Sequence, residues 1–373
     1  MTKICKRCGL DDRIPSISFN EKGECNFCGL YNTWNVQYDT HKPELLLNMV
    51  NRIKQDGKNA KYDCVVGVSG GCDSSYLLYL TKEWGLRPLA VHWDNGWNSD
   101  IAKSNLEKMT KGLSVDLEVY TSDFREINDI NRSFLLASVT DVDIPNDIAL
   151  ETVLHEAADK HNIKYILNGH SYQTEGTTPL GWTYMDAKYI QSVHKMFGKY
   201  PMKTFHNLWL SKWLKWCVVD RIRHIRPLWY VKYNKAETKL LLNKKFGWEW
   251  YGGHHKENKY TLFSMWHNNN RFGIDMRLIG NAALVRDGQQ TLAESYESTR
   301  EPIEMSKKEL DEIFSALGIT SEEYTKILSL EKKTHKDYET YQETYHRLRY
   351  FFWVLAKLDL VPMTFYIKYA KGI

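Results

Sequence analysis

A short turn rich in serine and glycine constrains the fold of this chain more than any other part of its sequence. The turn, Ser69-Gly70-Gly71-Cys72-Asp73-Ser74, follows the apolar run 64–68 and precedes a segment, 74–84, whose leucines recur at helical spacing. Glycine lets backbone N–H groups approach a ligand closely, and the N-terminal end of a helix attracts negative charge. The sequence therefore predicts a buried strand, a phosphate-binding turn and a helix, in that order.

Two common nucleotide-binding folds are disfavoured by what this turn lacks. It has neither the GxxxxGK[ST] pattern nor its lysine, which argues against a P-loop kinase or GTPase. It also has no GxGxxG pattern, which argues against an enzyme that binds a nicotinamide dinucleotide.

Strand and helix patterns alternate in the 80 or so residues that follow the turn. The expected strands and helices lie, in order, at 86–93, 99–111, 116–120, 147–161 and 163–167. This alternation predicts an α/β fold with a doubly wound parallel sheet. Because ligands of such sheets bind at the carboxyl ends of the strands, the turns at Ser69, Asp94 and Gly169 should meet there.

Four of the seven cysteines form two pairs near the N-terminus, Cys5 with Cys8 and Cys25 with Cys28. Two CxxC turns at this spacing can place four thiolates around one zinc ion. Residues 1–34 are too few and too polar to bury a core of their own, so we expect a structural zinc ion to hold them together. An iron–sulfur cluster or a redox-active pair is the alternative.

Three further regions follow the cysteine unit. Residues 35–60 are expected to form a linker helix, residues 61–235 the nucleotide-binding domain, and residues 236–373 a mostly helical substrate or partner region. Helical patterns in the last region span 306–317, 321–330 and 338–358. Because no apolar stretch approaches the length of a membrane helix and the N-terminus lacks the apolar part of a signal peptide, we expect a cytoplasmic protein without a membrane partner.

Basic residues are concentrated between residues 199 and 256, a stretch with 13 Lys and Arg and only three acidic residues, although the formal net charge of the whole chain is only +4. Such a block suits an anionic ligand, either a phosphorylated small molecule or a nucleic-acid backbone. Composition does not separate the two. Trp209, Trp213 and Trp216 recur at helical spacing within the block, and we expect them to lie in the core.

The strand, the SGGCDS turn and the helix together resemble the PP-loop ATP pyrophosphatases, which have the adenine nucleotide alpha-hydrolase-like fold. The family includes GMP synthetase, argininosuccinate synthetase and tRNA thiolation enzymes. The resemblance implies that ATP is cleaved between its α and β phosphates. A substrate oxygen would be adenylated, pyrophosphate would leave, and a nitrogen or sulfur nucleophile would displace AMP.

Further motifs make residues 1 to about 300 similar to the N-acetyl sugar amidotransferase family, which makes acetamidino sugars for surface polysaccharides or flagellin glycans. They are the four-cysteine unit, the SGGCDS turn, Thr174-Glu175-Gly176, Arg223 to Leu228, Phe246 to Gly253, and Phe272 to Arg277. The chain departs from that family at His254, where a lysine is expected, and at Gly169-His170-Ser171, which is closer to the tRNA enzymes.

The resemblance also implies roles for individual residues. The expected nucleotide-binding residues are Ser69, Gly70, Gly71, Asp73, Ser74, Ser75, His92, Asp94 and Gly169. Asp73, His170 and Glu175 would be catalytic, with Asp73 holding Mg²⁺ beside the phosphates of ATP. The expected substrate-binding residues are Arg223, Arg226, Lys235, Tyr251, Gly252, Gly253 and His254. A helix cap for Asp73 and a solvated surface for the basic residues are the structural alternatives.

The source of ammonia would be a second protein. Residue 2 is Thr rather than the Cys of an N-terminal-nucleophile glutaminase, and neither Cys64 nor Cys217 lies in a GxCxG context. We therefore expect a separate glutaminase subunit to supply ammonia for reaction with a small sugar substrate. Nucleic acid is not expected as a partner in this interpretation.

Two other functions remain open from the sequence. A tRNA sulfurtransferase would share the turn, the zinc unit and the basic block, but it would need a sulfur-carrying cysteine. Beyond the four-cysteine unit only Cys64, Cys72 and Cys217 are present. A non-enzymatic subunit that binds zinc and nucleotide is the third possibility.

Overall fold

The computed structural model describes residues 2–253 and 256–371. At its centre lies a sheet of five parallel strands in the order β3-β2-β1-β4-β5. The strands are β1 (Cys64–Gly67), β2 (Pro88–Asp94), β3 (Leu117–Thr121), β4 (Tyr165–Leu167) and β5 (Arg223–Ile225). The predicted doubly wound parallel sheet is confirmed. Its order reverses direction between β1 and β4, the place where such sheets leave a crevice for ligands.

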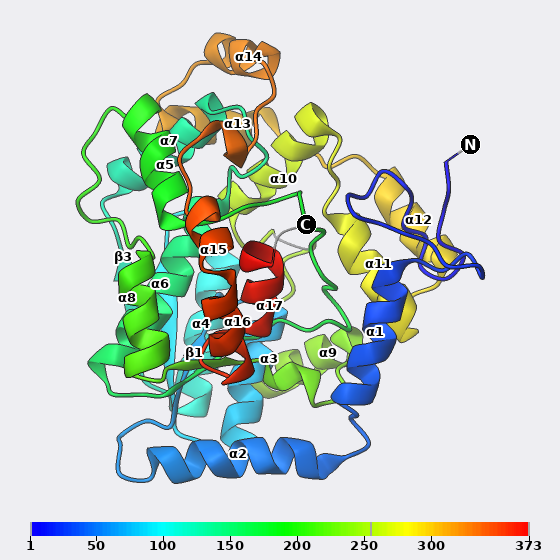
Figure 1. Ribbon diagram of the computed structural model, residues 1–373, viewed down its shortest axis with the longest axis vertical. Coiled ribbons are helices and arrows are strands. Elements are labelled where there is room, and N and C mark those ends of the chain that lie inside the picture. Colours follow the sequence, from blue (N-terminus) through cyan, green and yellow to red (C-terminus); the bar gives the residue numbers. More distant parts are fainter. Residues whose placement is uncertain (1, 254–255, 372–373) are drawn as a thin grey trace.

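Helices cover both faces of the sheet because the strands are apolar on both sides. Val66 of β1 packs in a cluster with Leu77 and Leu78, whereas its neighbour Val65 packs in another with Val153 and Leu154. The first face is covered by α2 (Pro43–Gly57), α3 (Cys72–Glu83), α4 (Asp100–Leu113) and α9 (Lys235–Phe246). The second face is covered chiefly by α6 (Ile144–Lys160). The result is a three-layer arrangement (Figure 1).

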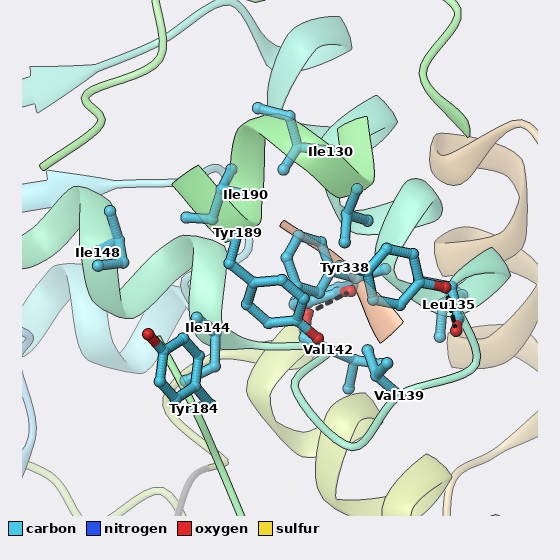
Figure 2. Packing of buried hydrophobic residues seen from close by; sticks show 14 of the residues in the cluster. Ile130, Leu135, Val139, Val142, Ile144, Ile148, Tyr184, Tyr189, Ile190 and Tyr338 are labelled. Atoms are coloured by element: carbon cyan, nitrogen blue, oxygen red, sulfur yellow. Dashed lines mark hydrogen bonds between the residues drawn. The ribbon is translucent and has the colours of Figure 1, made fainter. Parts of the chain in front are cut away.

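A second core lies beside the sheet and is built from helices that are distant in sequence. It joins α5 (Phe124–Leu136), α7 (Ala187–Phe197), α10 (Lys259–Phe272), α13 (Lys307–Leu317) and α16 (Arg349–Lys357). Figure 2 shows Tyr189 and Tyr338 packed among Ile130, Val139 and Val142. The buried hydroxyl of Tyr338 donates to the backbone oxygen of Ala137 at 2.8 Å, which satisfies this polar atom inside the aromatic core.

The cysteine unit packs on the C-terminal region rather than on the sheet. Its buried cysteines cluster with Ile279 and Ala282 of α11 (Arg277–Asp287), and Gly9 approaches Tyr296 of α12 (Leu292–Arg300). Figure 1 shows the blue N-terminal segment beside these yellow helices. Helix α1 (Asn26–Gln37) continues past the expected boundary of this unit at residue 34.

Most predicted helices form, but two expected patterns differ. The segment 338–358 is not one helix: α15 (Gln342–Arg347) and α16 are separated at Leu348. The tryptophan face at 209–216 spans α8 (Leu210–Leu214) and a π-helical turn, Lys215–Val219. Trp213 and Trp216 are buried there, as expected. The remaining helices are α14 (Ser321–Ser329) and α17 (Met363–Phe365). Within residues 2–253 and 256–371, no helix combines the length and apolar character that crossing a bilayer requires.

Candidate active site

A pocket of about 420 Å³ lies at the carboxyl ends of β1, β2 and β4. The SGGCDS turn forms one wall, and the turns after β2 and β4 form the floor. The third side comes from Tyr251, Glu257, Asn258 and Thr261, which belong to the C-terminal region. The predicted meeting of the turns after three strands is therefore confirmed, and a segment from outside the sheet domain completes the pocket.

The SGGCDS turn is held in one conformation by its own side chains. The backbone N–H of Gly71 donates to Ser69 Oγ at 3.2 Å, and the N–H of Ser69 donates to Ser74 Oγ at 3.2 Å. Gly70 has φ +79°, and a Cβ atom there would lie 2.1 Å from the backbone oxygen of Ala102 in α4. Gly70 is thus required both by its backbone angle and by the close approach of a helix.

Contacts from two other elements fix the carbonyl of Gly70. Its oxygen accepts hydrogen bonds from Trp248 Nε1 at 3.1 Å and from Asn105 Nδ2 at 3.3 Å. The Trp248 side chain is fully buried and packs in the same core as α3. The sequence singles out the Phe246-to-Gly253 stretch as a motif and predicts substrate contacts for Tyr251, Gly252 and Gly253, whereas the role of Trp248 emerges only from the structure. Trp248 anchors the turn from the C-terminal side.

Asp73 lies at the start of α3 and joins Lys235 and Tyr233 in one cluster. Lys235 Nζ donates to Asp73 Oδ2 at 2.9 Å, and the Tyr233 hydroxyl donates to Oδ1. Burial opposes the charge on Lys235, but the carboxylates of Asp73 and Glu175 raise its pKa above the usual range. Lys235 is therefore a cation held in the pocket by acidic neighbours, and not part of a solvated face.

His170 and Glu175 lie at the end of β4, where the sequence placed them. His170 Nε2 is 2.9 Å from the backbone oxygen of Gly176, and Trp229 Nε1 is 3.4 Å from Nδ1. Burial, reinforced by the charge of Arg226, lowers the pKa of His170 to about 4, so the ring is neutral at pH 7. Glu175 Oε2 accepts the backbone N–H of Ser171 at 3.2 Å. The catalytic roles of both residues stay predictions.

The other expected nucleotide-binding residues divide into two groups. Ser69, Gly71, Ser74, His92 and Gly169 line the pocket, whereas Gly70, Ser75 and Asp94 are not among its lining residues. His92 Nδ1 lies 2.7 Å from the backbone oxygen of Val68, and burial lowers its pKa. Asp94 accepts the backbone N–H of Gly96 at 2.8 Å and thereby shapes the turn after β2.

Amide side chains that the sequence did not single out line the pocket where the turn after β2 meets the C-terminal region. Asn258 Nδ2 donates to Asn95 at 2.9 Å and to Asn98 at 3.2 Å, and Asn95 donates to Asn146 at 3.0 Å. Backbone bonds fasten this region to the sheet domain, since Ser99 N donates to Glu257 O and Lys259 N to Trp97 O, both at 2.8 Å. No local pattern in the sequence marks these residues, because their proximity arises from tertiary packing.

The expected substrate-binding residues do not all meet. Lys235 and Tyr251 line the pocket beside the SGGCDS turn, while Arg223 and Arg226 line a neighbouring pocket of about 400 Å³. Asn168 lines both pockets. Gly252 and Gly253 continue from Tyr251 but do not line either pocket, and His254 lies outside the described residues.

The four N-terminal cysteines form a compact cluster of buried thiols. The sulfur atoms of Cys5 and Cys28 are 3.7 Å apart, those of Cys8 and Cys25 3.6 Å, and those of Cys25 and Cys28 3.7 Å. Four ligands placed about 2.3 Å from a tetrahedral centre are separated by about 3.8 Å. The backbone N–H of Cys25 also donates to the sulfur of Cys5 at 3.3 Å. The donor set and its spacing fit a zinc ion.

Comparison with known proteins finds partial matches to this chain. Residues 243–351 match the family described as "LPS biosynthesis protein WbpG-like, C-terminal domain". An uncharacterized protein from Methanocaldococcus jannaschii is 31% identical over 112 residues, 30% of this chain and 39% of the relative. A tRNA(Ile)-lysidine synthase from Chlamydia pneumoniae is 39% identical over 67 residues, 17% of this chain and 21% of the relative. The chain thus spans less than half the length of these curated relatives.

Two solved structures align with the chain more loosely. One is described as a predicted subunit of tRNA methyltransferase from Methanocaldococcus jannaschii, with 17% identity, a TM-score of 0.28, and coverage of 58% of this chain and 90% of the other. The second is NMN synthetase from Francisella tularensis, with 13% identity, a TM-score of 0.28, and coverage of 74% of this chain and 92% of the other.

The strand order and the position of the SGGCDS turn after the central strand determine the fold class. The chain has a doubly wound α/β fold with five parallel strands, a four-cysteine cluster at its N-terminus, and a helical C-terminal region that includes the segment matching the WbpG-like domain.

Proposed function

We propose that this chain is an ATP-dependent amidotransferase that converts the acetamido group of an N-acetyl sugar into an acetamidino group. The oxygen of the acetamido group is adenylated, and ammonia then replaces AMP. The products are the acetamidino sugar, AMP and pyrophosphate, for use in surface polysaccharide or glycan synthesis.

One observation carries the proposal: the SGGCDS turn and the WbpG-like region line the same pocket. A turn of this type suits the phosphates of ATP, and the amide groups where the turn after β2 meets the WbpG-like region suit a second substrate. Asn95, Asn98 and Asn258 can both donate to and accept from sugar hydroxyls and an acetamido group. The two reactants would therefore meet at the boundary between the two regions.

The charges in the pocket suit a magnesium complex of ATP. Of the described residues that line it, five carry carboxylates, whereas Lys235 is the one with an ammonium or guanidinium group. A free triphosphate would be repelled by so many carboxylates, but these hard oxygen donors fit Mg²⁺, and one of them, Asp73, belongs to the turn itself. When bound, Mg²⁺ would neutralise charge on the phosphates. Lys235 supplies the protein's own positive charge.

The residues of the chain lower two barriers. In the first step the acetamide oxygen attacks the α-phosphorus, and the bond to the β,γ-diphosphate breaks; the turn and Lys235 stabilise the departing pyrophosphate. In the second step ammonia adds to the imidate carbon, and the C–O bond to AMP breaks. AMP is a good leaving group because it departs as a stable anion, whereas the oxygen of an unactivated acetamide is a poor leaving group. Ammonia loses protons on the way to the amidine, and the carboxylates of the pocket are the available acceptors.

The alternative of a tRNA sulfurtransferase is weakened by the state of the remaining thiols. Cys64, Cys72 and Cys217 are all buried. Burial, followed by the charge of Asp73, raises the pKa of Cys72 to about 12, and burial likewise raises the pKa of Cys64 above its usual range. A sulfur carrier needs an accessible thiolate, which these environments disfavour.

Two accessory features complete the proposal. The four-cysteine cluster binds one structural zinc ion, which leaves no coordination position for catalysis. Ammonia comes from a separate glutaminase subunit. Purification of the native complex tests the second point: a co-purifying glutaminase supports it, whereas glutamine-dependent activity of the isolated chain contradicts it.

The direct experiment combines the purified protein with ATP, MgCl₂, ammonium and a panel of free and nucleotide-linked N-acetyl sugars. The proposal predicts AMP and pyrophosphate in equal amounts, together with a sugar whose mass falls by the difference between O and NH. AMP formation that requires tRNA instead of a sugar would support the sulfurtransferase alternative. Formation of ADP would reject both.

A further inference from the structure

A group of three potential metal ligands lies outside both the nucleotide pocket and the cysteine cluster. Glu151 and His155 are one turn apart on α6, and His224 is the middle residue of β5. One ligand atom from each lies within 4.8 Å of the others. Glu151 and His224 also line the pocket of about 400 Å³ that holds Arg223 and Arg226.

The hydrogen bonds of these residues leave two imidazole nitrogens unsatisfied. His155 is fully buried, and its Nδ1 lies 2.9 Å from the backbone oxygen of Glu151. This contact assigns the proton to Nδ1, so Nε2 holds the lone pair, and no described residue donates a hydrogen bond to it. Buried polar atoms without partners are rare in folded proteins and need an explanation.

His224 is in a similar situation. Its Nε2 lies 3.0 Å from Glu151 Oε1, but the contact lacks the geometry of a hydrogen bond. A carboxylate oxygen and an imidazole nitrogen that approach each other in this way can share a cation as ligands. A ligating histidine commonly donates its other ring N–H to a backbone carbonyl, and His155 makes that contact already.

Packing holds the group in place before any ion arrives. Trp216 stacks on the His155 ring, with centroids 5.1 Å apart and planes 15° apart. The indole of Trp216 is itself fixed, because its Nε1 donates to Asp159 at 3.0 Å. The rings of His155 and His224 lie 4.8 Å apart. Such support from neighbouring residues is what a metal site needs to select one geometry.

We propose that Glu151, His155 and His224 bind a divalent transition-metal ion, with Zn²⁺ as the best match to two imidazoles and one carboxylate. The ion would neutralise the half-buried carboxylate of Glu151 and satisfy the imidazole nitrogens. Three protein ligands leave one tetrahedral position open, and it would face the pocket lined by Arg223 and Arg226. Water or a small anionic group of a ligand would occupy that position. This site is independent of the proposed amidotransferase reaction.

Metal content of the full chain provides the test. After dialysis against a small excess of Zn²⁺ and removal of free ion, the wild-type protein should hold two equivalents, one in each site. The double variant H155Q/H224Q should hold one equivalent. The matched control is His206→Gln, since His206 contacts Glu156 of the same helix at 2.7 Å outside the group; this variant should keep two equivalents.

Cobalt substitution separates the two sites spectroscopically. Thiolate-to-cobalt charge transfer in the near ultraviolet should come from the cysteine cluster alone and remain in H155Q/H224Q. The weaker visible bands of the nitrogen and oxygen site should disappear in that variant. Glu151→Gln provides a second route that preserves side-chain shape if the double variant does not fold, and it should also lose one equivalent. Equal zinc content in the wild type, Glu151→Gln and H155Q/H224Q would overturn the proposal.

Discussion

Replacement of Gly70 by alanine tests whether the geometry of the SGGCDS turn controls the reaction. At φ +79° an alanine costs about 1–2 kcal/mol in backbone strain. Its Cβ would also lie 2.1 Å from Ala102 O, so the two atoms must separate by about 1.3 Å to reach ordinary contact at 3.4 Å. Since a misplacement of about 1 Å can cost about 100-fold in rate, AMP formation should fall by about that factor.

Gly318→Ala is the matched control. Gly318 ends α13 at φ +62°, and no atom lies within 4 Å of a Cβ built there. In urea titrations Gly318→Ala should lose about 1–2 kcal/mol of unfolding free energy through backbone strain alone, and Gly70→Ala should lose more because its Cβ also meets Ala102 O. Only Gly70→Ala should lose AMP formation. Full activity of Gly70→Ala would refute the assigned role of the turn. An equal loss of AMP formation in Gly70→Ala and Gly318→Ala would refute it as well.

Three further predictions concern two neighbours of the turn and Asp141, a buried carboxyl group that accepts a hydrogen bond from the Tyr189 hydroxyl in the second core. Lys235→Met removes the positive charge that binds Asp73 through a charge-assisted hydrogen bond, an interaction of a kind worth about 1.5–3 kcal/mol. If the same charge stabilises the phosphates, kcat/KM for ATP should fall about 10- to 100-fold in steady-state assays. An unchanged kcat/KM would contradict a role of Lys235 in phosphate binding. Trp248→Phe removes one donor to Gly70 O and should cost about 1 kcal/mol of stability in denaturant titrations, with a smaller loss of AMP formation than Gly70→Ala. Burial raises the pKa of Asp141 from 3.8 to about 7, so between these values the folded state holds a proton that the unfolded chain has lost. The free energy of unfolding should therefore decrease as pH rises from about 4 to 7. Asp141→Asn should flatten this part of the plot of stability against pH, and an unaltered plot would contradict the assignment.

The central part of the fold could be predicted because its signals are local. The apolar strands, the SGGCDS turn and the following helix each occupy a short continuous stretch, so Ser69, Asp94 and Gly169 could be placed at one edge of the sheet from sequence alone. The cysteine cluster could be predicted for the same reason, because each of its two CxxC turns is a local pattern that places two thiols side by side.

The remaining features depend on contacts between distant segments. Strand β5 has only three residues, two of them basic and none fully buried, so its pattern resembles a loop. Asn258 and Trp248 reach the site through tertiary packing: no sequence pattern marks Asn258, and the motif around Trp248 does not indicate its contact with Gly70. His224 joins Glu151 and His155 only because β5 lies beside β4 and α6 covers the sheet.

The fate of the acetamide oxygen tests the proposed reaction most directly. An N-acetyl sugar that is a substrate would be labelled with ¹⁸O in its acetyl carbonyl and incubated with the protein, ATP, magnesium and ammonium. Adenylation predicts that the label appears in the phosphate group of AMP and that pyrophosphate stays unlabelled. Label recovered in inorganic phosphate, with ADP as the nucleotide product, would contradict the mechanism.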